Sequence, residues 1–449
     1  MRILILDVYP ETNYRISKDQ NGGYGTANNY GRNLISKLLK IFVKNSIDFP
    51  PLYSVYVAGE LLNQGYDVSY SKNLDSKDFD LYILPSSIVC HETEIHYVKK
   101  LKSLNKNVVV IGPFATANSE LYINAGATVI KGEPEMYFHN RKLTIDLIKD
   151  FPKIIENFKI YDLDELSIPG WEVIFKNYIP KMKFLGPGPT INIHASRGCP
   201  YSCAYYCVYP LQQGNKLRRK SSEKLINEML YFYEKFNVKN FIFRDPVFSI
   251  DRNHTLKICN AIIRLGLKFN ICIETHLKNI DQELAIILKK TGVKLIYVGI
   301  ESANDNVRKD AKRTSDTNEN QIDKVRYLEK LGMKVKAMYI IGMPSDTRET
   351  FSNTVNYSKK ISSTYAQFSV FTPYPGTPVF NDYKNKITKL KYEDFTQWQL
   401  VFKHNNLSEN DVLDLLDYSY KEYYTNPKWL IHYINMKLKE IYENMLNRL

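Results

Sequence analysis

The sequence predicts an α/β protein in which a doubly wound, Rossmann-like first domain precedes a partial (β/α)6 barrel and a small helical C-terminal region. Its 449 residues are enough for two or three domains. Short apolar runs alternate with helical periods along most of the chain, and one segment rich in proline and glycine interrupts them. We therefore assign residues 1–140 to the first domain, 141–188 to a connector, 189–378 to the barrel and 379–449 to the C-terminal region.

The first domain is predicted from short apolar strands separated by helical segments. The strands are RILILD, DVSYS, DLYILP and NVVVIG, and the helices lie around residues 28 to 45, at LYSVYVAGELLNQG and after His91. This alternation predicts a parallel sheet with helices on both faces. Ligands of such sheets bind beyond the carboxyl ends of the strands. Small residues in two of those loops, Ser86, Ser87 and Gly112, permit the close approach of a ligand, although ordinary loop chemistry explains them equally well.

Six further strands predict the barrel. They are TINIHAS, FIFRD, FNICIET, KLIYVGI, VKAMYIIGM and QFSVFTP, with helical stretches such as SEKLINEMLYFYEKF and ENQIDKVRYLEKLG between them. Strand–helix units in series predict a parallel barrel or partial barrel with its chemistry at the carboxyl ends of the strands. The chain ends in an amphipathic segment, WLIHYINMKLKEIYENMLNRL, for which we expect a packed helix; a helix on a membrane surface is the alternative.

Composition and charge exclude several classes of protein. No apolar stretch is long enough to span a membrane, and MRILILDVYP has neither the basic leader nor the cleavage site of a signal peptide, so we expect a cytoplasmic protein. Lys and Arg number 61 against 48 Asp and Glu, a net charge of +13. Because these basic residues are scattered rather than clustered, the charge does not favour nucleic acid as a partner.

Three of the six cysteines, Cys199, Cys203 and Cys207, lie within nine residues on the loop after the first barrel strand. A helix that buries three sulfur atoms is one explanation, but a glycine and a proline interrupt the run. A structural zinc site is the second, with His194 as the fourth ligand. An iron–sulfur cluster is the third, and here three thiolates leave one iron open to bind another molecule. The other three cysteines are interpreted as buried apolar residues.

The run SRGCPYSCAYYC resembles the cluster loop of the radical S-adenosylmethionine (SAM) enzymes. The resemblance implies a 4Fe–4S cluster on Cys199, Cys203 and Cys207 whose open iron chelates SAM. It also implies an external electron donor such as flavodoxin or ferredoxin, and reductive cleavage of SAM to a 5'-deoxyadenosyl radical. One departure concerns the spacing, because the family usually has three and then two residues between its cysteines, whereas this chain has three and three.

Positions of the later strands match the same family and imply contacts to SAM. Glu274 lies in CIETHL, Glu301 and Ser302 lie in LIYVGIES, and Ile341 and Gly342 lie in YIIGMPSDTRET. Tyr206, just before the third cysteine, matches an aromatic residue whose backbone contacts the adenine. For the two glutamates, an ordinary ion pair at the barrel end is an equally good explanation without the resemblance.

The first domain resembles the cobalamin-binding domain of one branch of this family, through FPPLYSVYVAGELLNQGYDV, LPSSIV, VVVIGPFATA and IKGEPE. The resemblance implies that the nucleotide tail of cobalamin lies in the sheet crevice beside Ser86, Ser87 and Gly112. Two features depart from the pattern: no Asp-x-His-x-x-Gly run is present, and Pro113 replaces the second of two paired glycines. A domain without cofactor that only shapes the substrate site is the alternative.

The function that the resemblance implies is cobalamin-dependent methylation of an unactivated carbon. In such a reaction the deoxyadenosyl radical removes a hydrogen atom and the substrate radical takes a methyl group from methylcobalamin. Radical cyclisation or rearrangement is the first alternative, and a non-catalytic cobalamin- or zinc-binding protein is the second. Small molecules, lipids and peptides are all candidate substrates.

Overall fold

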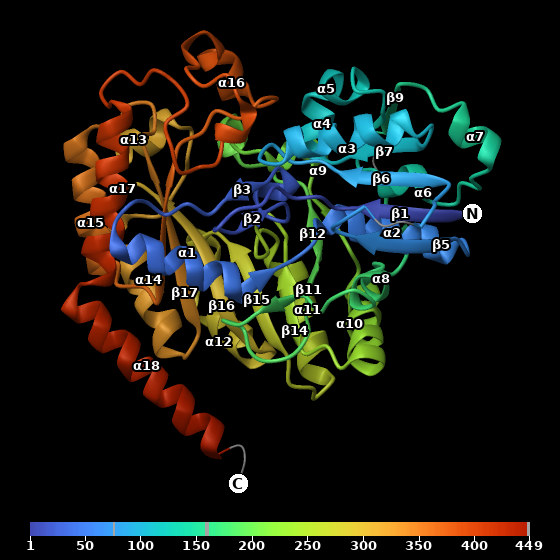
Figure 1. Cartoon of the computed structure of the whole chain (residues 1–449). Coiled ribbons are helices and arrows are strands. Elements are labelled where there is room, and N and C mark those ends of the chain that lie inside the picture. Colours follow the sequence, from blue (N-terminus) through green and yellow to red (C-terminus); the bar gives the residue numbers. More distant parts are fainter. Residues whose placement is uncertain (75–76, 158–160, 447–449) are drawn as a thin grey trace.

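Six parallel strands form the first sheet of the computed structural model, which describes residues 1–74, 77–157 and 161–446 (Figure 1). In spatial order they are β5 (Asp67–Ser71), β1 (Arg2–Leu6), β6 (Leu81–Pro85), β7 (Asn107–Ile111), β8 (Thr128–Gly132) and β9 (Ile154–Asn157). Because β1 pairs with both β5 and β6, the strand order reverses between β1 and β6. That reversal is the switch point of a doubly wound sheet, so the predicted fold class of this part is confirmed.

Helices cover both faces of the first sheet. One face carries α3 (His91–Ser103), α4 (Pro113–Ala117) and α5 (Ser119–Ile123), and the other carries α2 (Leu52–Asn63) with α6 (Glu135–Phe138) and α8 (Trp171–Phe175) (Figure 1). All ten residues from Leu52 to Leu61 are buried because α2 lies between the sheet and the barrel. This position explains why the sequence LYSVYVAGEL is apolar on every side of the helix.

The segment 141–188, which we expected to be a connector, contributes to the first sheet. It contains α7 (Ile145–Lys149), and its strand β9 pairs with β8 from Val129↔Ile154 to Gly132↔Asn157. Pro152 interrupts the helical pattern of this segment, but it does not prevent the edge strand β9, which starts two residues later. The boundaries of the four segments stay a prediction.

The second sheet consists of six parallel strands that follow one another in chain order. They are β11 (Thr190–Ile193), β14 (Asn240–Phe243), β15 (Asn270–Thr275), β16 (Val293–Glu301), β17 (Lys334–Ile341) and β18 (Tyr365–Val370). The first and last of them are the two ends of the sheet, so the barrel is partial, as predicted. Its helices are α10 (Ser222–Phe236), α11 (Arg252–Arg264), α12 (Gln282–Thr291), α13 (Asp305–Asp310), α14 (Asn318–Lys330) and α15 (Arg348–Ile361).

Short side chains fix where the barrel helices begin. The helices α10, α11, α12, α14 and α15 start directly after Ser221, Asp251, Asp281, Thr317 and Thr347. Each of these side chains accepts a hydrogen bond from a backbone N–H in the first turn, which is worth about 1 kcal/mol per helix. Each helix therefore starts at a defined distance from the strand before it, and the loops that carry the site have fixed lengths.

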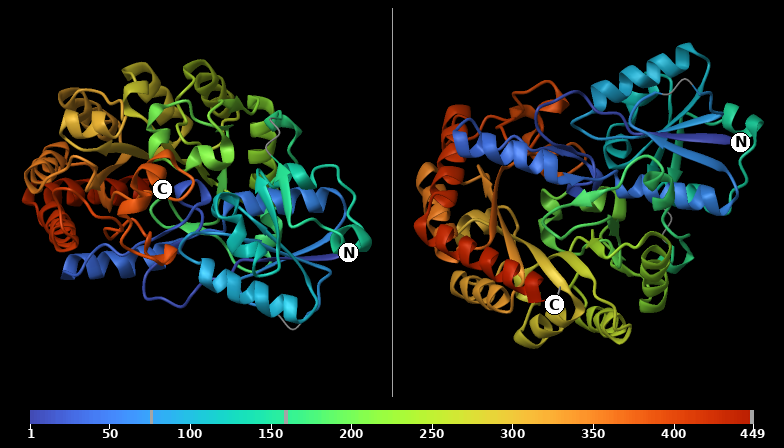
Figure 2. Two further views of the ribbon diagram at one scale, coloured as in Figure 1. Left: turned by 90° about the horizontal axis from the view of Figure 1, so that it is seen from above. Right: turned by 60° about the horizontal axis from the view of Figure 1, so that its bottom comes forward.

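The chain crosses from the first sheet to the barrel immediately after β1. Residues 8–51 run along the barrel, and α1 (Leu34–Ser46) packs against α17 (Glu409–Tyr424) of the C-terminal region instead of joining the first sheet (Figures 1 and 2). Small two-stranded ladders tie this segment down: β2 (Ile16–Ser17) with β3 (Thr26–Ala27), and β4 (Ile47–Asp48) with β10 (Lys181–Met182). As a result, residues of the N-terminal segment reach the interior of the barrel.

The C-terminal region covers the open edge of the barrel at β18. The Tyr420 hydroxyl of α17 accepts a hydrogen bond from the N–H of Phe368 in β18 and donates one to its C=O. The Tyr424 hydroxyl does the same with Ala366, and the four distances are 2.8 to 3.1 Å. These bonds satisfy backbone groups that an exposed edge strand would leave free. The predicted terminal helix is α18 (Pro427–Leu446). None of the helices in the described residues is both long and apolar enough to cross a bilayer.

The remaining elements are short. They are β12 (Ser196–Arg197), β13 (Arg218–Arg219), α9 (Tyr209–Gln213), α16 (Pro378–Tyr383), and the 3-10 helices η1 (Asn21–Gly23), η2 (Leu163–Glu165), η3 (Ser202–Tyr205), η4 (Leu277–Asn279), η5 (Lys384–Lys386) and η6 (Tyr392–Asp394).

Candidate functional site

The three clustered cysteines line one cavity at the carboxyl ends of the barrel strands. This cavity, which we call the cysteine cavity, includes Cys199, Cys203 and Cys207 in its lining. The backbone N–H of Cys207 donates to the carbonyl of Cys203 at 3.1 Å, so these two residues lie one helical turn apart. Residues four apart in such a turn share a face. The unusual spacing therefore still directs all three cysteines to the same space.

The cysteine cavity fits a cluster better than a single metal ion. Among the described residues, no three His, Cys, Asp or Glu side chains are arranged to ligate one metal ion. Burial, and then the neighbouring thiol of Cys203, raise the pKa of the Cys207 thiol to about 12. A thiol with that pKa is protonated at neutral pH unless a cationic metal centre stabilises its thiolate. Three thiols around an open space are the donor set that a 4Fe–4S cluster with one free iron needs.

His194 does not belong to the cysteine cavity, which argues against the zinc interpretation. Its ring stacks on Tyr56 at a centroid distance of 5.7 Å and lines a separate cavity. Burial and the cations around it, first of them Arg197, hold the pKa of His194 well below its usual value. The expected fourth ligand of zinc is therefore a neutral histidine that faces away from the thiols.

Glu301 stands at the end of β16 in a strained conformation. Its φ of 63° is in the left-handed region, and the pairing of β16 with β17 shifts register between Gly299 and Glu301. Arg313 explains why this conformation persists, since its guanidinium lies 3.1 Å from the Glu301 carboxylate and 3.0 Å from the carbonyl of Gly299. The same guanidinium lies 3.8 Å from Cys203 Sγ. Strain of this kind is concentrated at functional sites, so Glu301 is a candidate ligand-binding residue.

Glu274 is held in a buried ion-pair network. One of its oxygens is 2.8 Å from Arg244, and the other accepts a hydrogen bond from the Tyr209 hydroxyl at 3.1 Å. Arg244 also contacts Asp19 at 2.6 Å, and Asp19 in turn pairs with Arg15 at 2.7 Å. The network links the N-terminal segment to the cysteine cavity. Glu274 therefore forms an ion pair and also lines the cavity.

Of the other residues predicted to contact SAM, Tyr206 lines the cysteine cavity, but Ser302, Ile341 and Gly342 do not. Ser302 is buried beside Thr354 at 3.2 Å. Along β17 the residues alternate between partly and fully buried, and Ile340 faces the cavity, whereas Ile341 packs against the helices. The predicted SAM contacts of Ser302, Ile341 and Gly342 stay predictions. Adjacent residues of a strand point to opposite sides of the sheet, which is why the neighbours Glu301 and Ile340 line the cavity.

The predicted cobalamin crevice is filled by side chains of the protein. Lys18 reaches the switch point, where its Nζ lies 3.2 Å from Asp7, 2.8 Å from Glu94 and 3.0 Å from the carbonyl of Pro85. Tyr53 donates to the carbonyl of Ser86 at 2.8 Å. This leaves no room at the three predicted residues.

Ser86, Ser87 and Gly112 each have a partner within the protein. Ser86 Oγ accepts a hydrogen bond from the N–H of Ala115 at 3.0 Å, and the N–H of Ser87 donates to Glu94 at 3.0 Å. A methyl group at Gly112, whose φ is 111°, would come within 2.5 Å of the Tyr53 hydroxyl. The nucleotide tail of cobalamin therefore does not fit beside these residues in this arrangement.

The sequence did not predict roles for Arg313, Arg244 and Lys18. Two of them pair with predicted site residues, Glu301 and Glu274, and Lys18 binds the carbonyl of Pro85, next to the predicted Ser86. Arg313 follows α13, in a run that carries no motif, and Lys18 comes from a segment with no predicted element. A buried basic residue is recognisable only once its carboxylate partners are known. Local sequence gives no signal for such pairs.

The chain matches the family model of the Radical SAM superfamily over residues 193–357, which contain most of the barrel and its three clustered cysteines. It is 28% identical over 369 residues to an uncharacterised methyltransferase of Pyrococcus horikoshii, covering 77% of each chain. It is 22% identical over 344 residues to the bacteriochlorophyllide d C-12(1)-methyltransferase of Chlorobaculum tepidum, covering 76% of this chain and 74% of the other.

The fold of nearly the whole chain is that of a solved radical SAM methyltransferase. The structure of TsrM from Kitasatospora setae with tryptophan and a SAM analogue matches with a TM-score of 0.64 and 14% identity, covering 92% of this chain and 88% of that chain. A second structure of TsrM, with cobalamin and a 4Fe–4S cluster, matches with a TM-score of 0.59 and 15% identity, covering 84% and 76%. The predicted two-part architecture is therefore confirmed.

Proposed function

We propose that this protein is a radical SAM methyltransferase of the cobalamin-dependent kind. The observation that carries the proposal is the cysteine cavity, where three thiols on one loop meet Glu274, Glu301 and Tyr206. The relatives support methyl transfer, since two of the proteins described above are named methyltransferases.

Each residue at the cavity has a proposed role. Cys199, Cys203 and Cys207 hold the cluster, and when bound the cluster supplies one electron at low potential to the sulfonium of SAM. Glu301, fixed by Arg313, accepts hydrogen bonds from the amino group of SAM. Tyr206, whose ring packs on Phe371 at 5.9 Å, presents its backbone to the adenine.

Cobalamin is proposed on the support of the relatives and of the doubly wound first domain. When bound, it supplies the methyl group. Its nucleotide tail could enter the crevice only after Lys18 and the following segment move, because these residues fill the switch point. That segment contains Gly22, Gly23 and Gly25, all with positive φ, so its backbone conformation depends on glycine.

The electron is proposed to come from a separate protein such as flavodoxin or ferredoxin. Outside the cysteine cavity, the described cysteines Cys90, Cys259 and Cys272 are buried, and they lie on three different elements or loops. Because a second cluster needs several neighbouring thiolates, the described part of the chain cannot carry its own electron relay of that kind.

The proposal is tested by anaerobic reconstitution of the full chain. We expect about four irons and four sulfides per chain, co-purified or reconstituted cobalamin, and release of 5'-deoxyadenosine from SAM under reduction. Formation of S-adenosylhomocysteine would report donation of the methyl group of SAM. One equivalent of zinc without sulfide, in a colourless sample, would overturn the proposal in favour of a binding protein.

Glu301→Gln is expected to weaken SAM binding by about 10- to 100-fold, because a hydrogen bond to a charged group contributes about 1.5–3 kcal/mol. The measurement is equilibrium dialysis of SAM with the reconstituted protein. Ser302→Ala is the matched control, since Ser302 is the adjacent residue but does not line the cavity. Equal losses for the two variants would show that the end of β16 acts only through packing.

A further inference from the structure

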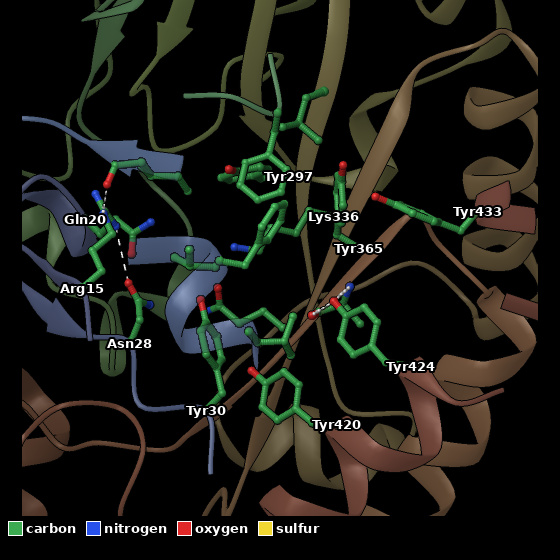
Figure 3. Close-up of a pocket in the computed structure, with 18 of the residues that line it drawn as sticks. Arg15, Gln20, Asn28, Tyr30, Tyr297, Lys336, Tyr365, Tyr420, Tyr424 and Tyr433 are labelled. Atoms are coloured by element: carbon green, nitrogen blue, oxygen red, sulfur yellow. Dashed lines mark hydrogen bonds between the residues drawn. The ribbon is translucent and has the colours of Figure 1, made fainter. Parts of the chain in front are cut away.

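A second large cavity lies beside the cysteine cavity, on the side covered by the N-terminal segment and the C-terminal helices (Figure 3). We call it the tyrosine pocket after Tyr30, Tyr297, Tyr365, Tyr420, Tyr424 and Tyr433. These rings come from β16, β18, α17, α18 and the segment before α1. Tyrosine rings offer apolar faces and polar edges, a surface that suits a partly aromatic ligand.

Lys336 is the uncompensated charge of the tyrosine pocket. Its side chain points into the space between the tyrosines and the N-terminal segment (Figure 3), and its Nζ lies 4.8 Å from the centre of the Tyr297 ring. No carboxylate of the described residues forms an ion pair with it. Arg15, the other cation at the pocket, is neutralised by Asp19. A half-buried ammonium without a counter-ion strongly favours an anionic ligand.

Several hydroxyls of the tyrosine pocket are also free to bind a ligand. Tyr420 and Tyr424 use theirs on the backbone of β18. The hydroxyls of Tyr30, Tyr297 and Tyr365, by contrast, have no hydrogen-bond partner among the residues that the structure describes. These three hydroxyls are not among the fully buried atoms, so they face the open space of the pocket, where a ligand can bind them.

The tyrosine pocket borders the place where the radical would form. Tyr297 and Gln367 line both the tyrosine pocket and the cysteine cavity. The two cavities therefore adjoin each other at these two side chains.

We propose that the tyrosine pocket binds the substrate, a small molecule with an apolar, ring-containing body and one anionic group, a carboxylate or a phosphate, that pairs with Lys336. The role of this molecule as the substrate rests on the proposed function, whereas its binding in the pocket does not. The anion would replace the missing counter-ion of Lys336, and the free hydroxyls would bind polar groups on the ring body.

The test uses the uncharged fluorophore N-phenyl-1-naphthylamine as a probe of the full, reconstituted chain. Three naphthalene competitors of similar size differ in charge: 1-naphthaleneacetate, 1-naphthyl phosphate and 1-naphthalenemethanol. We expect at least one anion to displace the probe about ten-fold better than the alcohol, and the better anion identifies the group. Ala366→Phe, which fills the pocket, should remove probe binding with an unchanged cluster content.

Lys336→Met should abolish the preference for the anion and leave probe affinity unchanged, whereas Lys336→Arg should keep the preference. Lys294→Met, at an exposed position of the neighbouring strand, is the matched control. A wild-type protein with no preference, a preference that survives in Lys336→Met, or probe binding that survives in Ala366→Phe would overturn the inference. The measurement needs neither SAM nor a reductant, so its failure is distinct from a failure to release 5'-deoxyadenosine.

The anion preference should also depend on pH. Burial lowers the pKa of Lys336 to about 8, with Arg15 and Arg244 acting in the same direction and Glu274 and Cys272 in the opposite one. The ammonium is charged below that pKa and neutral above it. The preference should therefore decline between pH 7 and 9 in the wild type and persist in Lys336→Arg, whose guanidinium stays charged.

Discussion

Replacement of Cys207 by alanine is expected to remove the iron–sulfur cluster and with it all release of 5'-deoxyadenosine from SAM. The physical reason is that a 4Fe–4S cluster with three protein ligands has no spare thiolate. The remaining described cysteines are buried away from the cavity, so none can take the place of Cys207. Iron in the reconstituted variant should fall from about four per chain to below about one.

Cys259→Ala is the matched control for this loss. Cys259 is fully buried on α11, on the outside of the sheet, and does not line the cysteine cavity. Its truncation removes one sulfur from packed surroundings and should lower stability by about 1 kcal/mol while iron, sulfide and turnover stay at wild-type values. A Cys207→Ala protein that retained its cluster would instead show that the extra residue between Cys203 and Cys207 has excluded Cys207 from ligation.

The strands and the cluster loop could be predicted from the sequence because their signals are local. Apolar runs such as NVVVIG and KLIYVGI become buried parallel strands, between two layers of helices in the first sheet and inside one outer layer of helices in the barrel. The three cysteines are close in sequence, so their proximity in space needs no knowledge of the fold. The turn from Cys203 to Cys207 then brings them to one side by backbone geometry alone.

Contacts between distant segments could not be predicted in this way. Arg313 meets Glu301 twelve residues away through the turn after α13, and Lys336 faces a pocket assembled from both ends of the chain. The path of residues 8–51 along the barrel has no signal in its own sequence, because the partner of α1 is α17, almost four hundred residues later. Such pairings depend on tertiary packing rather than on periodicity.

Lys18→Met is expected to destabilise the protein by about 3–5 kcal/mol, because it leaves the carboxylates of Asp7 and Glu94 buried without their cation. All three side chains are fully buried at the switch point of the first sheet. Burial opposes the charge of Lys18, but the two carboxylates outweigh it and raise the pKa of the ammonium, so Lys18 of the wild type is charged near neutrality. Urea unfolding of the full chain measures the change.

Two comparisons show whether this stability comes from the closed crevice. Lys72→Met removes a similar pair, Lys72 with Asp48 at 2.9 Å, but both groups are partly exposed, so the loss should stay below about 1 kcal/mol. Adding Glu94→Gln to Lys18→Met should restore part of the stability, since it removes one unpaired carboxylate. If Lys18→Met lowers the free energy of unfolding no more than Lys72→Met does, water reaches Asp7 and Glu94, and the crevice is open enough for a cofactor tail. A large decrease in that free energy would mean that cobalamin must displace Lys18 to bind in the crevice.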